Sequence, residues 1–377
     1  MSRNILLIVS SMGAGGAERV AANLANNWAD SGADVTLLVT YSGRGACAYA
    51  LNGGVRLRFL ADEVPYHGRS LVANLCRFFA LRRIINSSGP STAVSFLTNV
   101  NIAVLLASSG LKRMRVIVAE RTYPPAVPLS LIWGAVRRLV YPFAHCVVMQ
   151  TSEGLDWLSR EIPKARGAII PNPIPYPLPA AEPTLLPEDW ISPHRKLLLA
   201  VGRLSQEKGF DCLLEAFAEL APENPEWDLV ILGEGPLRDQ LENQAQVLRA
   251  AHRVHLPGRV GNVGDWYARA DLYVMSSHFE GFPNTLGEAM AHRCAAISFD
   301  CDTGPRDLIR HGENGLLVKP AGDAQALASA LRQLMQGSTQ RAEMAAKATE
   351  VRQQYSTDNI LKLWDQLFDS HAIPMRG

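Results

Sequence analysis

The feature that most constrains the fold is a repeated alternation between short apolar runs and segments with helical spacing. In the first half, runs typical of buried strands occupy residues 5–10, 35–40, 55–60, 93–97, 116–120 and 146–151. Between the first two runs, Val20, Leu24 and Trp28 recur at helical spacing. Strands that alternate with helices form parallel sheets through right-handed crossovers, with helices on both faces. We therefore predict a doubly wound α/β domain.

The same alternation returns in the second half. Strands are expected at 197–202, 229–233, 254–256, 272–276 and 296–299, and helices at 210–220, 237–249, 285–292 and 324–335. The segment 171–193 between the halves holds eight prolines, which neither a helix nor a central strand accepts, so we interpret it as a stiff linker. We predict two α/β domains, 1–175 and 176–355, facing a central cleft at the carboxyl ends of their strands.

Composition excludes several classes of protein. A hydrophobic content of 47% argues against disorder, and no apolar run reaches the ~18 residues of a membrane span. The first apolar run ends at Val9 and a glycine-rich loop follows, so we expect no signal peptide and a cytoplasmic protein. The six cysteines form no C-x-x-C pair and the nine histidines no ligand spacing, so no metal site is predicted.

The net charge of +1 hides a division between the halves. Residues 1–180 hold 18 basic and 9 acidic side chains, a balance of +9, and the remainder therefore carries −8. Such an asymmetry indicates that the N-terminal half meets an anionic surface. A net charge near zero and the lack of a base-reading motif argue against nucleic acid as that partner.

A glycine-rich loop follows the first predicted strand. Its sequence, SSMGAGGAER at 10–19, places Gly15 and Gly16 just before a helix, where backbone N–H groups suit an anion. It is not the dinucleotide-binding fingerprint, because the third glycine of that pattern is replaced by Glu18. A tight turn with no ligand is the other interpretation.

Two loops of the second domain carry candidate diphosphate ligands. Arg203 and Lys208 follow its first strand, so the guanidinium fork and the ammonium would converge on a diphosphate. Gly233, in the turn Gly-Glu-Gly after the next strand, would add backbone that lines the cleft. The alternative is that both basic side chains are simply solvated.

The most specific pattern is SSHFEGFPNTLGEA at 276–289. Glu280 and Glu288 bracket a turn that opens a helix, and carboxylates accept hydrogen bonds from sugar hydroxyls. The backbone N–H groups of Asn284, Thr285 and Leu286 would lie at the helix N-terminus, a place for phosphate. The alternative is an ordinary helix start with two surface glutamates.

Taken together, these segments resemble retaining glycosyltransferases of family 4, which have the GT-B fold. The resemblance rests on GGAER at 15–19, Gly202-Arg203 with Lys208, GEG at 233–235 and EGFPNTLGE at 280–288. The strings DTGPRD at 302–307 and GENGLLV at 312–318 resemble the members that build bacterial polysaccharides.

The resemblance implies two Rossmann-like domains, with the acceptor in the N-terminal one and the nucleotide sugar in the C-terminal one, and a C-terminal helix, 356–370, that packs back on the N-terminal domain. It assigns Arg203 and Lys208 to the diphosphate, Glu288 to the ribose, Glu280 to hydroxyls of the donor sugar, and the backbone near Arg259 to the base. It also implies catalysis without metal or other cofactor, because basic side chains and a helix N-terminus neutralise the leaving diphosphate.

One position departs from the family. Many members carry a histidine after a strand of the N-terminal domain, where this chain reads Ala-Glu-Arg-Thr at 119–122, so Arg121 replaces it. Glu120 and Arg121 thus join Glu280 as candidate catalytic residues. Two roles of Glu120 are possible: it acts as a base-like group, or it is a buried carboxylate paired with Arg121.

The leading hypothesis is a retaining glycosyltransferase that uses a UDP-hexose or UDP-N-acetylhexosamine. Its acceptor would be a polyprenyl-diphosphate-linked glycan, presented at the cytoplasmic face of the membrane. The alternatives are a UDP-sugar epimerase or hydrolase on the same scaffold, and a non-catalytic module that binds a membrane surface.

Membrane binding is predicted from the segment 69–85. The segment carries basic residues beside apolar residues at roughly helical spacing, as in helices that lie on anionic membranes. The basic residues are Arg69, Arg77, Arg82 and Arg83. Those apolar residues are Leu71, Leu75, Phe78, Phe79 and Leu81. The alternative is a helix that buries this apolar face in the N-terminal domain.

Overall fold

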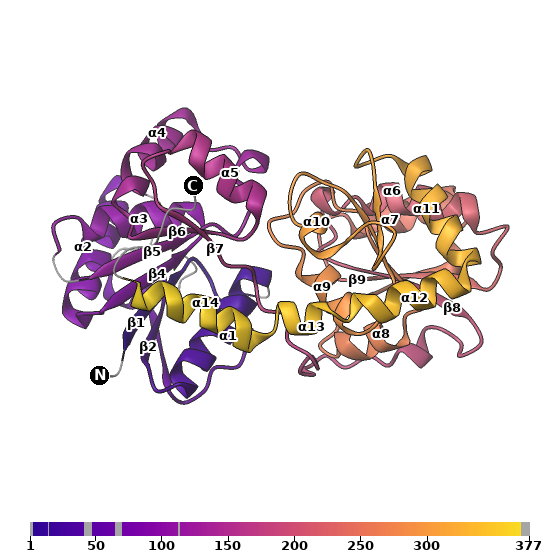
Figure 1. Ribbon diagram of the computed structural model, residues 1–377, viewed down its shortest axis with the longest axis horizontal. Helices are drawn as coiled ribbons and strands as arrows, with labels where there is room; N and C mark the ends of the chain where they lie inside the picture. Colours follow the sequence, from indigo (N-terminus) through magenta and orange to yellow (C-terminus); the bar gives the residue numbers. More distant parts are fainter. Residues whose placement is uncertain (1–2, 14, 41–46, 65–69, 112–113, 371–377) are drawn as a thin grey trace. The chain divides into compact units, whose positions relative to one another are not determined.

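The computed structural model describes residues 3–13, 15–40, 47–64, 70–111 and 114–370. The chain forms two compact units, which are described separately (Figure 1). The N-terminal unit comprises Met1–Asn172 with Ile360–Gly377, and the C-terminal unit comprises Pro173–Asn359.

The N-terminal unit contains a parallel sheet with the strand order β3-β2-β1-β4-β5-β6-β7. Its strands are β1 Asn4–Val9, β2 Asp34–Val39, β3 Val55–Phe59, β4 Thr92–Phe96, β5 Arg115–Ala119, β6 Cys146–Met149 and β7 Gly167–Ile169. Its helices are α1 Gly16–Asp30, α2 Leu71–Ser88, α3 Thr98–Ser108, α4 Leu131–Val140, α5 Ser152–Glu161 and the last turns of α14 Thr357–Asp369.

The C-terminal unit contains a second parallel sheet with the order β10-β9-β8-β11-β12-β13. Its strands are β8 Lys196–Val201, β9 Trp227–Leu232, β10 Val254–Gly258, β11 Leu272–Met275, β12 Ala296–Phe299 and β13 Leu316–Val318. Its helices are α6 Phe210–Leu220, α7 Arg238–Val247, α8 Val263–Arg269, α9 Asn284–Ala291, α10 Pro305–Leu308, α11 Ala324–Gln336, α12 Ser338–Ala348 and α13 Val351–Gln354.

Both sheets are doubly wound, which confirms the predicted fold class. In the N-terminal unit the chain runs outward from β1 in one direction and then from β4 in the other. In the C-terminal unit the same reversal lies between β8 and β11. Loops at the carboxyl ends of the strands part at such a switch point, and this is where ligands bind in doubly wound folds.

The proline-rich segment 171–193 contains the boundary between the two units, which lies between Asn172 and Pro173. From Pro173 onward it belongs to the C-terminal unit and packs along it. The Ile174 amide donates to the Tyr355 carbonyl at 2.8 Å, the Asn262 side chain bonds both backbone groups of Leu185, and Ile191 is only 1% exposed. Proline prevents regular secondary structure here, but it does not prevent apolar packing.

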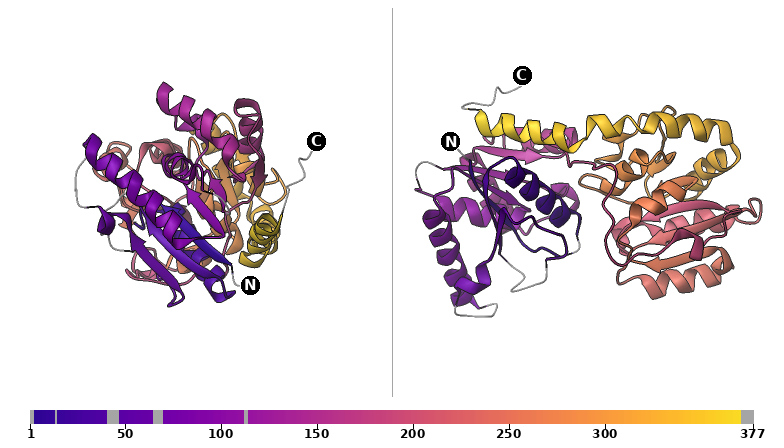
Figure 2. Two further views of the ribbon diagram at one scale, coloured as in Figure 1. Left: turned by 90° about the vertical axis from the view of Figure 1, so that its left-hand side faces the viewer. Right: turned by 90° about the horizontal axis from the view of Figure 1, so that it is seen from below.

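The last helix, α14, packs on the N-terminal unit from Ile360 onward, and Figure 2 shows it lying along that unit. The indole of Trp364 is fully buried and meets the ring of Trp28 in α1 edge to face, with 5.6 Å between centroids. Phe368 contacts Trp28 from the next turn at 5.4 Å. Arg3, before β1, forms ion pairs with Asp365 and Asp369.

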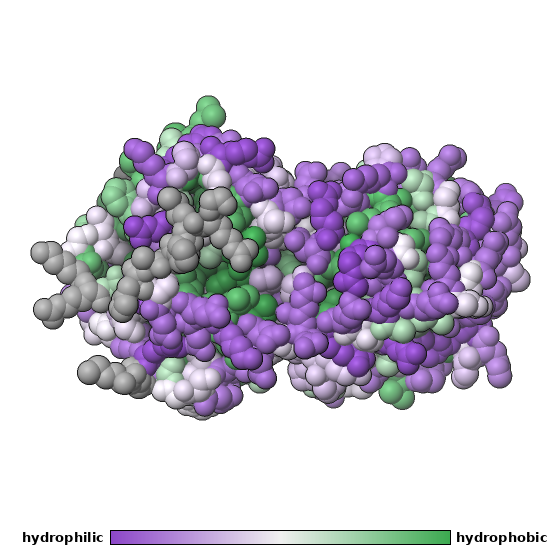
Figure 3. Space-filling model, viewed as in Figure 1, coloured by the Kyte–Doolittle hydropathy of each residue, from purple (hydrophilic) through white to green (hydrophobic). Residues whose placement is uncertain are grey.

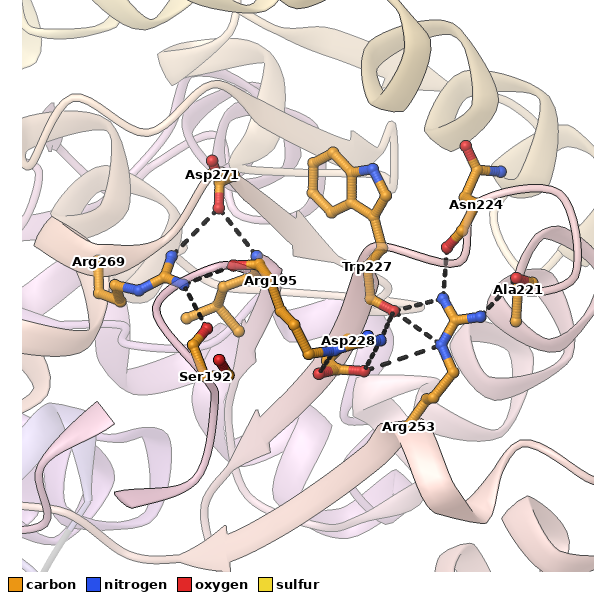
Figure 4. A network of polar contacts seen from close by, with 10 residues as sticks. Ser192, Arg195, Ala221, Asn224, Trp227, Asp228, Arg253, Arg269 and Asp271 are labelled. Carbon is orange, nitrogen blue, oxygen red and sulfur yellow. Dashed lines mark hydrogen bonds and ion pairs between the residues drawn. The ribbon is translucent and has the colours of Figure 1, made fainter. Parts of the chain in front are cut away.

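A polar network braces the amino ends of the C-terminal strands (Figure 4). Arg195, just before β8, forms a two-point ion pair with the buried Asp228 of β9. Arg253, just before β10, donates to the Trp227 carbonyl at 2.9 Å, and Asp271, just before β11, accepts from the Leu197 amide at 2.9 Å. These contacts lie at the edge opposite the switch point, so they support the scaffold rather than a ligand.

Candidate active site

An ion pair between Lys208 and Glu280 occupies the switch point of the C-terminal sheet. Lys208 ends a short 3-10 helix after β8, and Glu280 lies in the loop after β11. The Lys208 Nζ donates to Glu280 Oε1 at 2.6 Å, and the Ser277 hydroxyl donates to the same oxygen at 2.7 Å. Sequence reasoning gave these residues separate partners, the diphosphate and the sugar. The structure brings the two side chains into contact with each other.

The Glu280 carboxylate keeps the largely buried Lys208 side chain in its charged form. The side chains of Lys208 and Glu280 are only 21% and 11% exposed. Burial opposes the charged form of the lysine, but the attraction of the Glu280 carboxylate outweighs it and raises the pKa of Lys208. An oxyanion that reaches this place therefore meets a fully charged ammonium at neutral pH.

Two glycines allow the loops around this pair to approach closely. Gly209 has a φ of +59°, and a Cβ there would lie 2.2 Å from the Ser276 carbonyl oxygen. Gly233, after β9, has a φ of +139°, and its Cβ would lie 1.8 Å from the Gly202 carbonyl oxygen. Both positions therefore require glycine for this close approach.

Arg203 and Arg259 lie at the same edge of the sheet. Arg203 follows β8 and Arg259 follows β10, and both residues are exposed. The turn at Gly233 lies between them, because its amide donates to the Gly258 carbonyl at 2.8 Å. The strand order β10-β9-β8 thus places these loops side by side.

Helix α9 presents its N-terminus near the loop that holds Glu280. Asn284 and Thr285 are partly exposed, and the Thr285 hydroxyl accepts from the Tyr273 hydroxyl at 2.9 Å. Leu286 is fully buried, so only its backbone can serve a ligand. Glu288 is 2% exposed and accepts from the Tyr267 hydroxyl at 3.2 Å. Its burial excludes the alternative of two surface glutamates.

The loop at Gly15 and Gly16 differs from the predicted anion site. The Ser11 hydroxyl donates to Glu18 Oε1 at 2.6 Å, and a Cβ on Gly15 would lie 2.2 Å from Glu18 Oε2. The Glu18 carboxylate therefore faces the start of α1 and places a negative charge beside the helix N-terminus. Position 14 of this loop lies outside the described residues.

Glu120, at the end of β5, is bonded inside the N-terminal unit. It is 1% exposed, and its oxygens accept from the Tyr141 and Thr98 hydroxyls, the latter at 2.7 Å. Burial raises the pKa of Glu120. The interpretation that pairs it with Arg121 is wrong, because the Arg121 Nη1 donates to Asn172 Oδ1 at 2.8 Å.

Several polar residues of the site were not found from the sequence. Ser277 lies three residues before Glu280, within the same motif, so its role was open to prediction. Tyr267 of α8, Tyr273 of β11 and Thr303, whose hydroxyl donates to the Glu280 carbonyl at 2.6 Å, come from other elements. No local pattern links them to the two glutamates.

The predicted membrane face of α2 is only partly exposed. Leu75 and Phe79 are 51% and 63% exposed, but Leu81 is buried. Arg82 donates to the carbonyls of Ala107 and Ser109, and Arg83 pairs with Glu63 at 2.6 Å. Two of the four predicted arginines, Arg82 and Arg83, thus have partners within the unit. Arg69 lies outside the described residues.

Two features of the described part of the chain bear on metals and membranes. No group of three or more His, Cys, Asp or Glu side chains is placed to hold a metal ion. None of the helices there has the length and apolar character to cross a bilayer.

Comparison with known proteins adds to this geometry. Residues 15–173 match the model of the glycosyl transferase 4-like domain, and residues 187–351 match that of glycosyl transferases group 1. An exopolysaccharide phosphotransferase of Streptomyces coelicolor is 30% identical over 89% of this chain, which spans 37% of that relative. A Campylobacter jejuni α-1,4-N-acetyl-D-galactosaminyltransferase, named for an undecaprenol-diphosphate-linked glycan, is 28% identical over 96% of this chain and 97% of its own.

The fold matches solved structures over almost its whole length. The Anabaena protein HepE, solved with UDP and glucose, superposes with a TM-score of 0.80 at 19% identity, covering 97% of this chain and 99% of its own.

Two doubly wound units, matched by these two domain models, define a glycosyltransferase. The chain belongs to the family 4-type glycosyltransferases of the GT-B fold, as the motifs indicated.

Proposed function

We propose that this glycosyltransferase moves a hexose or N-acetylhexosamine from a UDP-sugar to a lipid-linked glycan, with retention of anomeric configuration and without a metal ion. The observation that carries the proposal is the Lys208–Glu280 ion pair at the switch point. The exposed Arg203 lies between β8 and Lys208. The Campylobacter relative supports the acceptor class, and the Anabaena complex supports the donor.

The donor diphosphate is held by positive charge and by oriented N–H groups. Lys208 and Arg203 bind its oxygens, and the first turn of α9, at Asn284 and Thr285, adds backbone donors. As the diphosphate engages Lys208, the Glu280 carboxylate gains capacity to accept from hydroxyls of the donor sugar. Glu288 accepts from the ribose, and the backbone at Arg259 borders the base.

Retention follows from attack on the same face that the diphosphate leaves. The bond between the anomeric carbon and the β-phosphate oxygen breaks as the acceptor oxygen bonds to that carbon. The acceptor proton passes to a phosphate oxygen, and UDP departs. Lys208 and Arg203 stabilise the negative charge that grows on the diphosphate, so the protein supplies positioning and electrostatics rather than a nucleophile.

A donor screen tests the function. The protein is incubated with UDP-, GDP- and dTDP-sugars and a lipid-linked acceptor, and mass spectrometry detects the extended glycan. NMR of the product reports the anomeric configuration. Epimerised or hydrolysed UDP-sugar in the absence of acceptor would favour the epimerase or hydrolase instead.

Chelation tests the metal-free reaction. We expect excess EDTA to leave the transfer rate unchanged within about twofold, because Lys208, Arg203 and the start of α9 supply the charge that a metal would otherwise supply. Steady-state rates with EDTA are compared with rates after added magnesium. Loss of activity that magnesium restores would contradict this prediction.

The two glutamates are expected to affect different steps. Glu288→Gln should weaken UDP binding about 10-fold or more, because a charged acceptor for the ribose is lost. Glu280→Gln should lower kcat by more than it weakens UDP binding, because its partner is the donor sugar. Calorimetry with UDP and steady-state kinetics measure both. Equal loss of UDP affinity in the two variants would rule out this division of roles.

We further propose that the N-terminal unit binds the cytoplasmic face of an anionic membrane, where a lipid-linked acceptor is presented. Helix α4 supports this more than α2 does, since Leu131, Ile132 and Trp133 are 94%, 76% and 49% exposed. In Figure 3 a small hydrophobic projection lies at the top of the N-terminal unit, where Figure 1 draws α4. Exposed apolar residues beside Arg137 and Arg138, in the last turn of α4, suit an anionic interface.

Vesicle flotation tests this surface. The double variant Leu131→Ser and Ile132→Ser should bind anionic vesicles at least about 10-fold more weakly, because burying each side chain contributes ~1.5–3 kcal/mol. Val247→Ser is the matched control, since Val247 is 73% exposed on the C-terminal unit. Equal binding by the double variant and wild type would exclude α4 as the contact.

A further inference from the structure

The guanidinium of Arg121 is fixed in position at the carboxyl end of β5. Its Nη1 donates to Asn172 Oδ1 at 2.8 Å, and its Cζ lies 3.7 Å from the centroid of the Phe96 ring. The Trp364 ring is 6.0 Å away, and Arg121 as a whole is 7% exposed. Nη1 and one face of the guanidinium therefore make contacts that fix its position.

The other two donor nitrogens of Arg121 have no hydrogen-bond partner among the described residues. Nε and Nη2 are both buried, and they share one edge of the planar group. This edge makes two parallel hydrogen bonds to a carboxylate or phosphate. A buried guanidinium without a counter-charge is unfavourable, and burial lowers the pKa of Arg121 to about 9. This edge of the guanidinium, which suits an oxyanion, is thus unpaired among the described residues.

The neighbouring side chains fit such a ligand. Glu120 does not neutralise Arg121, because its oxygens are engaged by Tyr141 and Thr98. Gln150, after β6, donates through Nε2 to Asn172 Oδ1 at 2.7 Å, and its Oε1 is buried with no partner in the described part of the chain. Two donors and one acceptor together suit a phosphate with a hydroxyl group beside it.

We propose that Arg121 binds a phosphate of a glycosyl diphosphate through Nε and Nη2, and that Gln150 accepts from a hydroxyl next to it. The proposal rests on the glycosyltransferase function and specifies a phosphate-binding residue in the N-terminal unit. The diphosphate has two sources, the nucleotide-sugar donor and the lipid-linked acceptor. Arg121 thus donates two hydrogen bonds to one oxyanion, at a position where many family members carry histidine.

Two substitutions of Arg121 separate the contribution of its paired hydrogen bonds from those of its charge and of its apolar contacts. Arg121→Lys keeps the charge but cannot form two parallel hydrogen bonds, and Arg121→Met keeps apolar contact with Phe96 but loses the charge. Arg56→Met is the matched control, because Arg56 is 61% exposed and pairs with Asp34 on the surface of the same unit. Thermal unfolding establishes that each variant is folded. If Arg121→Met does not fold, the binding data for Arg121→Lys alone test the proposal.

Calorimetry in two arms identifies the source of the phosphate. One arm titrates UDP, and the other titrates geranyl diphosphate, a soluble prenyl diphosphate, with and without saturating UDP. We expect Arg121→Lys to weaken the binding of one of these ligands about 10-fold or more and Arg121→Met to weaken it further. Arg56→Met should have no effect. A change in the UDP arm identifies the donor, and a change in the geranyl diphosphate arm identifies the acceptor.

The proposal is overturned if both Arg121 variants bind UDP like the wild type and no binding of geranyl diphosphate depends on Arg121. Arg121 is then a packing residue. Failure of the glycosyltransferase function is a separate result, since it would appear as a wild-type protein that does not bind UDP. The geranyl diphosphate arm without UDP would still report on Arg121 in that case.

Discussion

Lys208→Met is expected to lower kcat/KM by about 100-fold to 1,000-fold, which corresponds to about 2.7–4 kcal/mol of transition-state stabilisation. The ammonium is the buried positive charge at the switch point, 2.6 Å from Glu280 Oε1. Methionine has a similar length but no charge, so the leaving diphosphate loses a cation. The change also leaves the Glu280 carboxylate without its ion-pair partner, which adds to the penalty.

Lys196→Met is the matched control for this substitution. Lys196 begins the same strand, β8, at its opposite end, and pairs with Glu226 at 3.5 Å. Steady-state kinetics of both variants should show a large loss for Lys208 and almost none for Lys196. The double variant with Glu280→Gln tests the coupling, because losses from two residues that act as one unit do not add. Near-normal kcat/KM in Lys208→Met would remove Lys208 from the site.

The local pattern of the sequence was sufficient to predict the fold class and most of the elements. The predicted helix at 210–220 is α6, and the predicted strand at 296–299 is β12. The edge strands β7 and β13 were missed, since each has three residues and carries no periodicity. The proline content of the segment 171–193 indicates which regular structures its backbone cannot form. It could not predict the burial of Ile191, because that depends on residues distant in the sequence.

The candidate site was predictable as a set of loops but not as a set of contacts. Spacing placed Lys208 and Glu280 after strands of one sheet, yet their pairing depends on β8 and β11 being neighbours. Motif reading could not show that the Glu18 carboxylate faces Gly15, because that depends on a side-chain rotamer. The sequence identified Arg121 by its position alone. That its Nε and Nη2 are unpaired among the described residues could be learned only from its contacts in the structure.

The largest expected effect on stability is that of Trp364→Ala in α14. The indole is fully buried and meets the Trp28 ring at 5.6 Å, with 81° between the planes. Removing a buried aromatic side chain costs its transfer free energy and leaves a cavity, so the free energy of unfolding of the N-terminal unit should fall by about 3–5 kcal/mol.

Hydrogen exchange read by mass spectrometry localises this effect. Faster exchange is expected in α1 and in the neighbouring β2, because Trp28 loses the partner that covers it. Trp190→Ala is the control, since Trp190 is 39% exposed on the C-terminal unit and its loss should leave exchange in α1 unchanged. Unaltered protection of α1 in Trp364→Ala would mean that the helix adds little to the unit it covers. Accelerated exchange there would instead make the end of the chain, some 330 residues after Trp28, part of the core of the first unit.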